Sequence, residues 1–227
     1  MQTALKFPPG LYGVTPDWDD VDRLEKAVRA AARGGMRALQ LRHKTAEPGL
    51  RRRLAQTLLQ VCQELDVVFL INDDWRLALE IGAHGVHVGQ HDDAPALVRQ
   101  EIGPDMLLGV SCYADPQRAQ QLLEHRVAYI AFGAMFPSAT KPLAPTAPLE
   151  VLAAGQKLCQ AIAAPRPAVV AIGGIGIKQA STLAAAGADS IAVVGSLFMA
   201  HDIEAAARAL AAPFAQTSTF YSSSSPV

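Results

Sequence analysis

Eight short apolar runs, each followed by a segment of helical character, dominate this sequence of 227 residues. Buried parallel strands appear as continuous apolar runs, and strands that alternate with helices are typical of parallel α/β domains. Eight repeats in a chain of this length favour a closed barrel over an open sheet, and no dinucleotide-binding glycine fingerprint follows the first run. We therefore predict a single (β/α)8 TIM barrel with parallel strands. The predicted strands span residues 11–14, 38–41, 67–71, 85–88, 107–110, 128–132, 168–172 and 190–194.

The alternation continues without a compositional break to about residue 212. The first predicted helix ends near residue 33, and the others span about 50–65, 75–81, 94–102, 115–124, 149–163, 178–186 and 202–212. Residues 1–212 should therefore form one barrel domain that carries the site. Residues 213–227 are rich in serine and threonine without a packing pattern, so we expect a disordered tail. The proline-rich stretch 133–148 is long for a loop inside a compact domain, which favours a functional role.

Charge and cysteine content exclude several classes of protein. The formal net charge is -1, from 20 basic and 21 acidic residues, so no global field favours nucleic acid or a membrane surface. Three cysteines without CxxC spacing argue against a disulfide framework or a zinc site and fit a reducing compartment. No signal peptide or membrane-spanning run is recognisable. We expect a cytoplasmic protein that acts on small molecules.

Carboxylates follow two of the predicted strands. Asn72, Asp73 and Asp74 come directly after the run at 67–71, and Asp92 and Asp93 follow the run at 85–88. A carboxylate at the end of a buried strand is costly unless a cation meets it, and its hard oxygens suit Mg²⁺. Alternatively, each acid caps the next helix or pairs with one of the bases Arg42, Lys44 and Lys141. We favour that alternative for Asp74 and Asp93, whereas spacing alone leaves the choice open for Asp73 and Asp92.

Basic and polar side chains also lie near strand ends, and cations there would neutralise phosphate groups. All strands of such a barrel end on one face, where active sites are built, so these residues should converge. The converging set is Gln40, Arg42, Lys44, Asn72, Asp73, Asp92, Ser111 and Lys141. His87 alternates with apolar residues, so we expect an interior packing histidine rather than a base. Cys112 is expected to line the site without acting as a catalytic thiol.

Small residues form two turns after the last two predicted strands, Gly173-Gly174 and Val194-Gly195-Ser196. Glycine lets backbone N–H groups approach an anion, and barrels commonly bind phosphate after strands seven and eight. The alternative is that these glycines only make tight turns. Because both turns occur together, we favour a phosphate site.

Taken together, these motifs resemble the thiamine-phosphate synthase family along nearly the whole chain, from Leu11 to Phe198. Several matched stretches in the same order make the resemblance specific, although any one alone would be weak. The matched stretches are Leu11-Tyr12-Gly13-Val14-Thr15, Gln40-Leu41-Arg42-His43-Lys44, Ile71-Asn72-Asp73, residues 85–92, Gly109-Val110-Ser111, residues 132–141 and Ile172-Gly173-Gly174-Ile175.

The resemblance implies a barrel enzyme that joins hydroxymethylpyrimidine diphosphate to a thiazole phosphate, giving thiamine phosphate and diphosphate. It implies Mg²⁺ as cofactor, held by Asp73 and Asp92. It also implies a dissociative reaction through a pyrimidine-methyl cation, with Arg42, Lys44, Ser111 and Lys141 as the catalytic set. The pyrimidine diphosphate would be held by Gln40, Arg42, Lys44, Asn72, Ser111 and Lys141. The thiazole phosphate would be held by Ser138, Thr140, Gly173, Gly174, Val194 and Gly195.

Three positions depart from the family pattern. His43 stands where Glu is common, Ser138 replaces a Thr, and Gly195 stands where a Ser usually follows the Val. Two alternatives share the barrel: a thiazole tautomerase, and a non-catalytic barrel that binds thiamine phosphate. Tautomerases tend to lack the metal-binding acids and to carry a His soon after the position of Ser111, so both acids favour the synthase. Family members are often oligomeric, but no stretch here identifies a homo-oligomer interface.

Overall fold

The structure, a computed structural model, describes residues 4–137 and 145–215. Eight parallel strands close into a barrel in which β1 pairs with both β2 and β8, as predicted. The strands are Gly10–Val14 (β1), Met36–Leu41 (β2), Val68–Asn72 (β3), Gly85–Val88 (β4), Leu107–Tyr113 (β5), Tyr129–Phe132 (β6), Ala168–Ile172 (β7) and Ser190–Val193 (β8).

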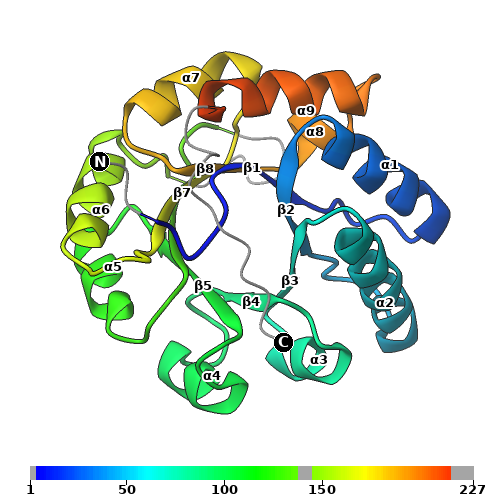
Figure 1. The fold of residues 1–227 in the computed structure, drawn as a ribbon, viewed down its shortest axis with the longest axis horizontal. Helices are drawn as coiled ribbons and strands as arrows, with labels where there is room; N and C mark the ends of the chain where they lie inside the picture. The colour runs from blue at the N-terminus through cyan, green and yellow to red at the C-terminus, as the bar shows by residue number, and fades with distance from the viewer. Residues whose placement is uncertain (1–3, 138–144, 216–227) are drawn as a thin grey trace.

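Helices surround the barrel and cover its outer surface (Figure 1). They are Val21–Arg33 (α1), Pro48–Glu64 (α2), Trp75–Ile81 (α3), Pro95–Ile102 (α4), Pro116–Leu123 (α5), Glu150–Gln160 (α6), Ile177–Ala185 (α7), Gly195–Phe198 (α8) and Ile203–Ala211 (α9), followed by the 3-10 helix Ala212–Phe214 (η1). The sequence pattern did not predict α8, a single turn directly after β8. None of the helices in residues 4–137 and 145–215 combines the length and apolar character needed to span a membrane.

Aspartates set several of the helix starts. The side chains of Asp20, Asp74, Asp115 and Asp202 each accept a hydrogen bond from a backbone N–H in the first turn of α1, α3, α5 and α9. Such caps satisfy donors that a helix leaves unpaired at its start. The cap expected of Asp74 is therefore confirmed, and its carboxylate is directed toward its own helix.

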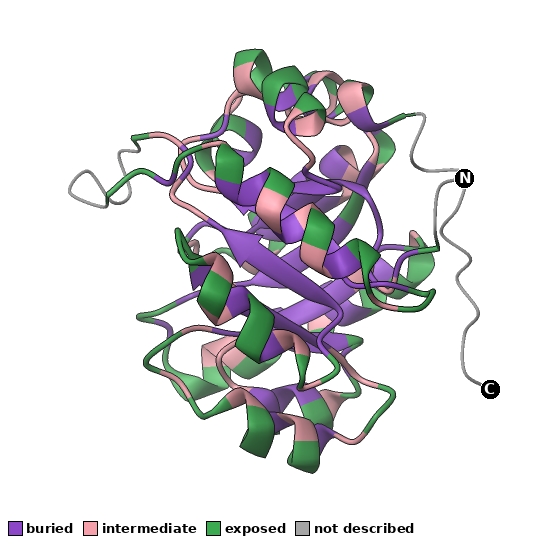
Figure 2. Cartoon of the chain, turned by 90° about the vertical axis from the view of Figure 1, so that its left-hand side faces the viewer, coloured by how far each residue is buried: buried purple, intermediate pink, exposed green. Residues whose placement is uncertain are grey.

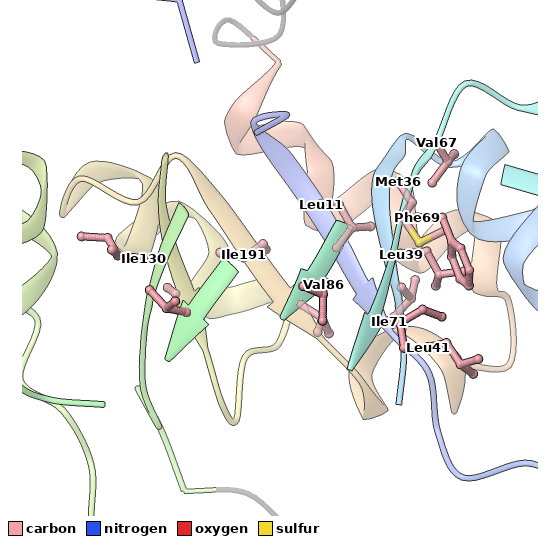
Figure 3. Packing of buried hydrophobic residues seen from close by; sticks show 14 of the residues in the cluster. Leu11, Met36, Leu39, Leu41, Val67, Phe69, Ile71, Val86, Ile130 and Ile191 are labelled. Carbon is pink, nitrogen blue, oxygen red and sulfur yellow. The ribbon is translucent and has the colours of Figure 1, made fainter. Parts of the chain in front are cut away.

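The strands separate two layers of apolar side chains. Residues that point outward fill the space beneath the helices, and we call this layer the outer core; Leu39, Phe69 and Ile71 belong to it (Figure 3). Residues that point inward fill the barrel itself, and we call this layer the inner core; Tyr12, Tyr129 and Val170 belong to it. Figure 2 shows the buried strands at the centre and exposed residues on the outer helix faces.

The amino end of the barrel is closed by the segment before β1. Phe7 is fully buried, and its ring lies 4.3 Å from that of Tyr129 and 5.1 Å from that of Tyr12, measured between centroids. The inner core is therefore packed at the amino end, so the opposite end, where the strands terminate, is where a ligand can enter.

The packed chain extends slightly beyond the predicted boundary at residue 212. Pro213 and Phe214 belong to η1, and Phe214 is buried at 1% exposure. These two residues were expected in the tail, but the aromatic ring adds apolar area to the outer core. Residues 216–227 lie outside the described part of the chain.

Candidate active site at the carboxyl ends of the strands

Strand β2 directs alternate side chains into the barrel, and Gln40 is one of them. Arg42 and Lys44 follow the end of the strand at Leu41. Gln40 is buried inside the barrel, Arg42 is half-buried at its mouth and Lys44 is exposed beyond it. The backbone of Arg42 is fixed by Thr15, whose hydroxyl accepts from the Arg42 N–H (2.9 Å) and donates to its carbonyl oxygen (3.1 Å). All three residues thus lie at or just beyond the carboxyl end of β2.

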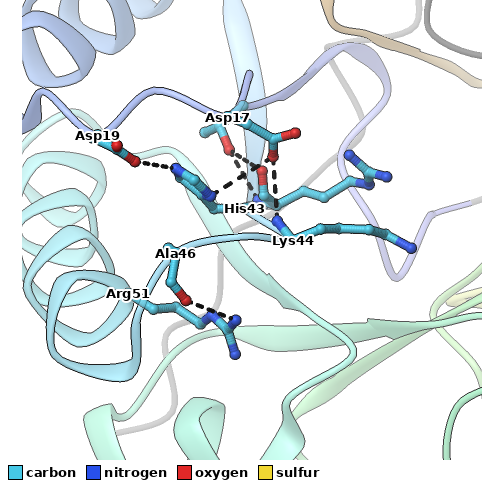
Figure 4. A network of polar contacts seen from close by, with 8 residues as sticks. Asp17, Asp19, His43, Lys44, Ala46 and Arg51 are labelled. Carbon is cyan, nitrogen blue, oxygen red and sulfur yellow. Dashed lines mark hydrogen bonds and ion pairs between the residues drawn. The ribbon is translucent and has the colours of Figure 1, made fainter.

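His43, which also follows β2, points away from the side chain of Lys44 (Figure 4). Its side chain is only 2% exposed, and its Nε2 lies 2.8 Å from a carboxylate oxygen of Asp19 (Figure 4). In the same network the Lys44 N–H donates to Asp17 (3.2 Å), while the Lys44 side chain extends away from both aspartates. The contact between His43 and Asp19 therefore joins the β2–α2 loop to the β1–α1 loop.

Asp73 and Asp92 lie together after β3 and β4. The pKa of Asp73 is raised to about 6, mainly by burial and then by a side-chain hydrogen bond with Asp92 and by the negative charge of Asp92. The positive charge of Lys44 and a hydrogen bond from Asn72 oppose this rise. Asp92 itself accepts a hydrogen bond from the Gly89 N–H at 2.6 Å. Asp73 has a positive φ of 63°, a conformation that Asp and Asn tolerate better than most residues. Two facing carboxylates in a half-buried position repel each other, and a cation between them relieves that repulsion.

The chemistry of this pair fits a divalent cation. Carboxylate oxygens are hard ligands that suit Mg²⁺, which usually keeps several waters and binds through one or two carboxylates and substrate phosphates. Within residues 4–137 and 145–215, no group of three or more His, Cys, Asp or Glu side chains could hold a metal by itself. Asp73 and Asp92 would therefore hold Mg²⁺ only together with oxygens from water or a ligand.

The neighbouring acid Asp93 is used elsewhere. Its Oδ2 accepts a hydrogen bond from the indole Nε1 of Trp75 (2.7 Å) and lies 3.3 Å from the guanidinium of Arg76, which lower its pKa. We expected Asp93 to cap the next helix or to pair with Arg42, Lys44 or Lys141, whereas the base that it meets is Arg76 of α3, and α4 has no side-chain cap. Asp92 and Asp93, although adjacent in sequence, thus have separate surroundings.

Ser111 lies on the inward face of β5, with its Oγ 2.9 Å from the Nε2 of His87. The other ring nitrogen of His87 lies 2.9 Å from the hydroxyl of Tyr129, so both are satisfied, as expected for an interior histidine. Burial lowers the pKa of His87 to about 4, so its ring is neutral at pH 7. Cys112 was expected to line the site, but it points outward into the outer core and is fully buried. Its position next to Ser111 on the strand places it on the other face.

The glycine turn after β7 is packed against the β6–α6 loop. Gly173 and Gly174 have positive φ angles of 100° and 64°. The Gly173 carbonyl accepts from the Phe136 N–H (3.0 Å), and a Cβ on Gly174 would collide with the carbonyl oxygens of Phe136 and Pro137. The glycines are therefore required for close backbone approach, whether or not a phosphate binds there. Space around Gly195, by contrast, is open, because no atom lies within 4 Å of a Cβ built there.

Three predicted residues, Ser138, Thr140 and Lys141, lie outside the described residues, so their predicted roles stay predictions. The flanks of this segment are fixed on either side of it. Met135 donates its N–H to the carbonyl of Ile172 (2.9 Å), and Ala147 donates to Ala134 (2.7 Å). Both flanks thus lie beside the glycine turn at the carboxyl end of β7.

Sequence reasoning missed the tyrosines Tyr12 and Tyr129. Both hydroxyls lie in the inner core beneath the site, 2.8 Å apart, and Tyr12 also accepts from the side-chain amide of Gln40 (2.7 Å). A tyrosine inside an apolar strand was the available signal, since a buried hydroxyl needs a partner. The identity of that partner could not be inferred, because the two residues are 117 positions apart.

Comparison with known proteins adds a second line of evidence. Residues 11–197 match the protein family described as thiamine monophosphate synthase. The thiamine-phosphate synthase of Bordetella avium is 58% identical over 214 residues, covering 94% of this chain and 99% of that protein. The protein of the same name from Bordetella pertussis is 57% identical over 211 residues, covering 93% and 97%.

Solved structures agree with the fold. A thiamine phosphate pyrophosphorylase from Pyrococcus furiosus matches with a TM-score of 0.78 at 29% identity, covering 93% of this chain and 98% of that one. A 3-hexulose-6-phosphate synthase matches with a TM-score of 0.66 at 19% identity, covering 90% and 99%. The second likeness concerns the fold alone.

Proposed function

Because the chain belongs to the thiamine monophosphate synthase family, we propose that it is a Mg²⁺-dependent thiamine-phosphate synthase. In this proposal it transfers the pyrimidinylmethyl group of hydroxymethylpyrimidine diphosphate to the nitrogen of a thiazole phosphate and releases diphosphate. The carboxylate pair Asp73 and Asp92, beside Lys44 at the carboxyl end of the barrel, is the observation that carries it. A phosphate-binding barrel without metal chemistry has no use for two facing acids at that place.

The metal would be held by Asp73 and Asp92, and when bound it would supply positive charge beside the diphosphate oxygens. Arg42 and Lys44, which follow the carboxyl end of β2, would add positive charge from the protein beside it. This charge stabilises the leaving diphosphate more strongly as its negative charge develops, which is the condition for lowering the barrier. Lys141 would add a third cation from the β6–α6 loop.

The reaction then needs positioning more than proton transfer. The C–O bond to the diphosphate breaks with its electron pair leaving on oxygen, and the thiazole nitrogen supplies the pair for the new C–N bond. Gln40, Asn72 and Ser111 lie on inward faces of β2, β3 and β5, where they would hold the pyrimidine in line with both partners. The packed inner core beneath them closes the amino end of the barrel, so water, which would capture the cation, could reach it only from the carboxyl end.

Ser138 and Thr140 would hold the phosphate of the thiazole substrate, together with the turns at Gly173-Gly174 and Val194-Gly195. Backbone N–H groups in such turns can donate to phosphate oxygens, and open space at Gly195 leaves room for them. The two substrates would thus be held at neighbouring strand ends, with the thiazole after β7 and β8 and the pyrimidine after β2 to β5.

A thiazole tautomerase is the second candidate, and such relatives tend to carry a His soon after the position of Ser111. The residue at that place, Cys112, is buried on the outer side, and burial raises the pKa of its thiol to about 12. A thiol that stays protonated at neutral pH and faces the helices cannot serve as a base in the barrel. This favours coupling over tautomerisation.

The test is an assay with both substrates and Mg²⁺, comparing wild type with Asp73→Asn and Asp93→Asn. Asp73→Asn should lower thiamine phosphate formation by a factor on the order of 10² or more, because a metal ligand is lost. Asp93→Asn changes the same atoms at a position directed toward Trp75 and Arg76, so its activity should stay close to wild type. An inactive wild type, or full activity in Asp73→Asn, would rule out the proposal.

A further inference from the structure

Five side chains inside the barrel form one continuous chain of hydrogen bonds. The amide Nε2 of Gln40 lies 2.7 Å from the hydroxyl of Tyr12, which lies 2.8 Å from the hydroxyl of Tyr129. The Tyr129 hydroxyl lies 2.9 Å from Nδ1 of His87, and Nε2 of His87 lies 2.9 Å from Oγ of Ser111. The five residues come from β2, β1, β6, β4 and β5 and cross the inner core directly beneath the predicted pyrimidine site.

The direction of the bonds follows from the Gln40 amide and from the need to satisfy each buried hydroxyl. An amide nitrogen can only donate, so the Tyr12 oxygen accepts from Gln40. On distance alone either tyrosine could donate to the other, but only a Tyr12 hydrogen directed to Tyr129 leaves each buried hydroxyl hydrogen with an acceptor inside the chain. The Tyr129 hydrogen then goes to Nδ1 of His87, which must be the unprotonated ring nitrogen. The hydrogen on Nε2 is donated to Ser111, whose own hydroxyl hydrogen is left for another acceptor. If the Gln40 amide were turned round, every bond would reverse, and the Ser111 hydrogen would be used inside the chain.

We propose that Tyr12, Tyr129 and His87 are positioning residues that hold this chain in one direction, so that Ser111 presents its hydrogen and Gln40 its carbonyl oxygen to the pyrimidine diphosphate. Ser111 is then a fixed donor for an anionic oxygen or a ring nitrogen, and Gln40 a fixed acceptor for an amino group. The ligand half of this inference rests on the proposed function, whereas the bond direction is a property of the protein alone.

The surroundings of the chain hold its members in place. The rings of His87 and Tyr129 are stacked, with centroids 5.6 Å apart and planes 13° apart, which fixes the plane of the imidazole. The Tyr129 ring occupies the space over Gly109, where any Cβ would collide with it. Because the hydroxyls are buried, breaking one link leaves a polar group unsatisfied, so the chain favours its complete form.

The imidazole tautomer of His87 tests the direction. Nitrogen NMR of the labelled full-length protein distinguishes a ring protonated on Nε2 from one protonated on Nδ1, and His87→Gln assigns the signal. His84 is an internal reference at the other end of β4, because its Nδ1 accepts the Phe69 N–H (2.9 Å) and its hydrogen must lie on Nε2. We expect His87 to show the same Nε2–H pattern as His84. A hydrogen on Nδ1 of His87 would overturn the inference.

Kinetics test whether this direction serves the reaction. Tyr129→Phe removes only one hydroxyl and should lower kcat about tenfold, with the KM for the thiazole phosphate unchanged and the His87 tautomers mixed. His87→Leu should match Ser111→Ala, both losing about 10² to 10³ in kcat, and the double variant should lose no more than either one. His87→Gln keeps a donor near the position of Nε2 and should recover part of the loss.

The outcomes separate this inference from the proposed function. A merely structural chain would lower the melting temperature of Tyr129→Phe while leaving kcat of the folded enzyme intact, and the losses in His87→Leu and Ser111→Ala would be independent. Either result would overturn the positioning role. An inactive wild type whose His87 carries the Nε2 hydrogen would refute the proposed function and leave the bond direction standing.

Discussion

At the scale of the residue, His43 attaches one loop to another. It follows β2, contacts Asp19 of the β1–α1 loop at 2.8 Å, and points away from the side chain of Lys44 (Figure 4). The role of His43 in the structure is therefore to join the β2–α2 and β1–α1 loops.

The raised pKa of Asp73 should make the stability of the metal-free protein depend on pH. The pKa of Asp73 is about 6 in the folded protein, against the ordinary value of 3.8 for an aspartate. Between these two pH values the folded state holds a proton that the unfolded chain has released. Stability falls with rising pH wherever the folded state binds more protons. Allowing for solvent screening of a half-exposed group, we expect a loss of about 1 kcal/mol in the free energy of unfolding as pH rises from about 4 to about 6.5.

Urea unfolding in EDTA at both pH values measures this loss. Asp73→Asn should lack it, because Asn cannot ionise and tolerates the positive φ at this position. Mg²⁺ added near pH 7 should raise the stability of wild type and leave that of Asp73→Asn unchanged. Equal pH dependence in both proteins would place the raised pKa elsewhere.

In the turn into α8, the substitution Gly195→Ser should raise the affinity for the thiazole phosphate. A Cβ at Gly195 would meet no atom within 4 Å, so Gly195→Ser should fit without strain and return the hydroxyl that the family usually carries there. A hydrogen bond to a charged phosphate should lower the KM for the thiazole phosphate by about tenfold. Steady-state kinetics with each substrate varied in turn would show this, and a change in the pyrimidine KM instead would contradict the assignment of this turn.

In the turn after β7, the substitution Gly174→Ala should lower the affinity for the thiazole phosphate. Gly174→Ala places a Cβ against the carbonyl oxygens of Phe136 and Pro137 at a φ of 64°, so the turn and the β6–α6 loop must separate. We expect the KM for the thiazole phosphate to rise and the free energy of unfolding to fall by about 1–3 kcal/mol. Gly49→Ala in α2 is the matched control, since it meets no atom within 4 Å and should stabilise slightly. A normal KM in Gly174→Ala would remove this turn from the site.

Stability of the whole barrel depends on a buried ion pair at its amino end. Arg166 donates from both terminal nitrogens to Asp189, at 2.9 Å and 2.8 Å, and Asp189 also accepts from the Val169 N–H. Their side chains are only 9% and 6% exposed. Asp189→Asn leaves Arg166 buried without its counter-charge and should cost about 3–5 kcal/mol in the free energy of unfolding.

The control is Glu204→Gln, which breaks the exposed pair with Arg33 (2.8 Å) and should cost less than about 1 kcal/mol. Thermal or urea unfolding compares the two variants. Because the pair lies at the opposite end from the predicted site, the folded fraction of Asp189→Asn should keep its kcat. Equal costs in both variants would show that burial adds nothing to the Arg166–Asp189 pair.

At the scale of the whole molecule, the sequence by itself determined the barrel. Apolar runs and helical patterns are local features of the sequence. Eight of each in alternation predicted eight parallel strands. Parallel strands all end on the same face of the barrel, so the pattern also predicted the end at which the polar side chains lie, namely Gln40, Asn72, Asp73, Asp92 and Ser111. The helix caps could be inferred for the same reason, since Asp74 acts on a residue three positions away. Short-range periodicity therefore gave both the fold and the face of the site.

Only the tertiary structure decided which side chains meet. Spacing left Asp73 and Asp92 open between ligands and caps, and their closeness appears only when β3 and β4 are paired. The chain from Gln40 through Tyr12, Tyr129 and His87 to Ser111 joins residues as many as 117 positions apart. Hydrogen-bond partners in a closed barrel are set by strand register and inward packing, which no local pattern records. The sequence thus predicted the end of the barrel at which the candidate site lies, and the packed barrel decided which of its groups meet.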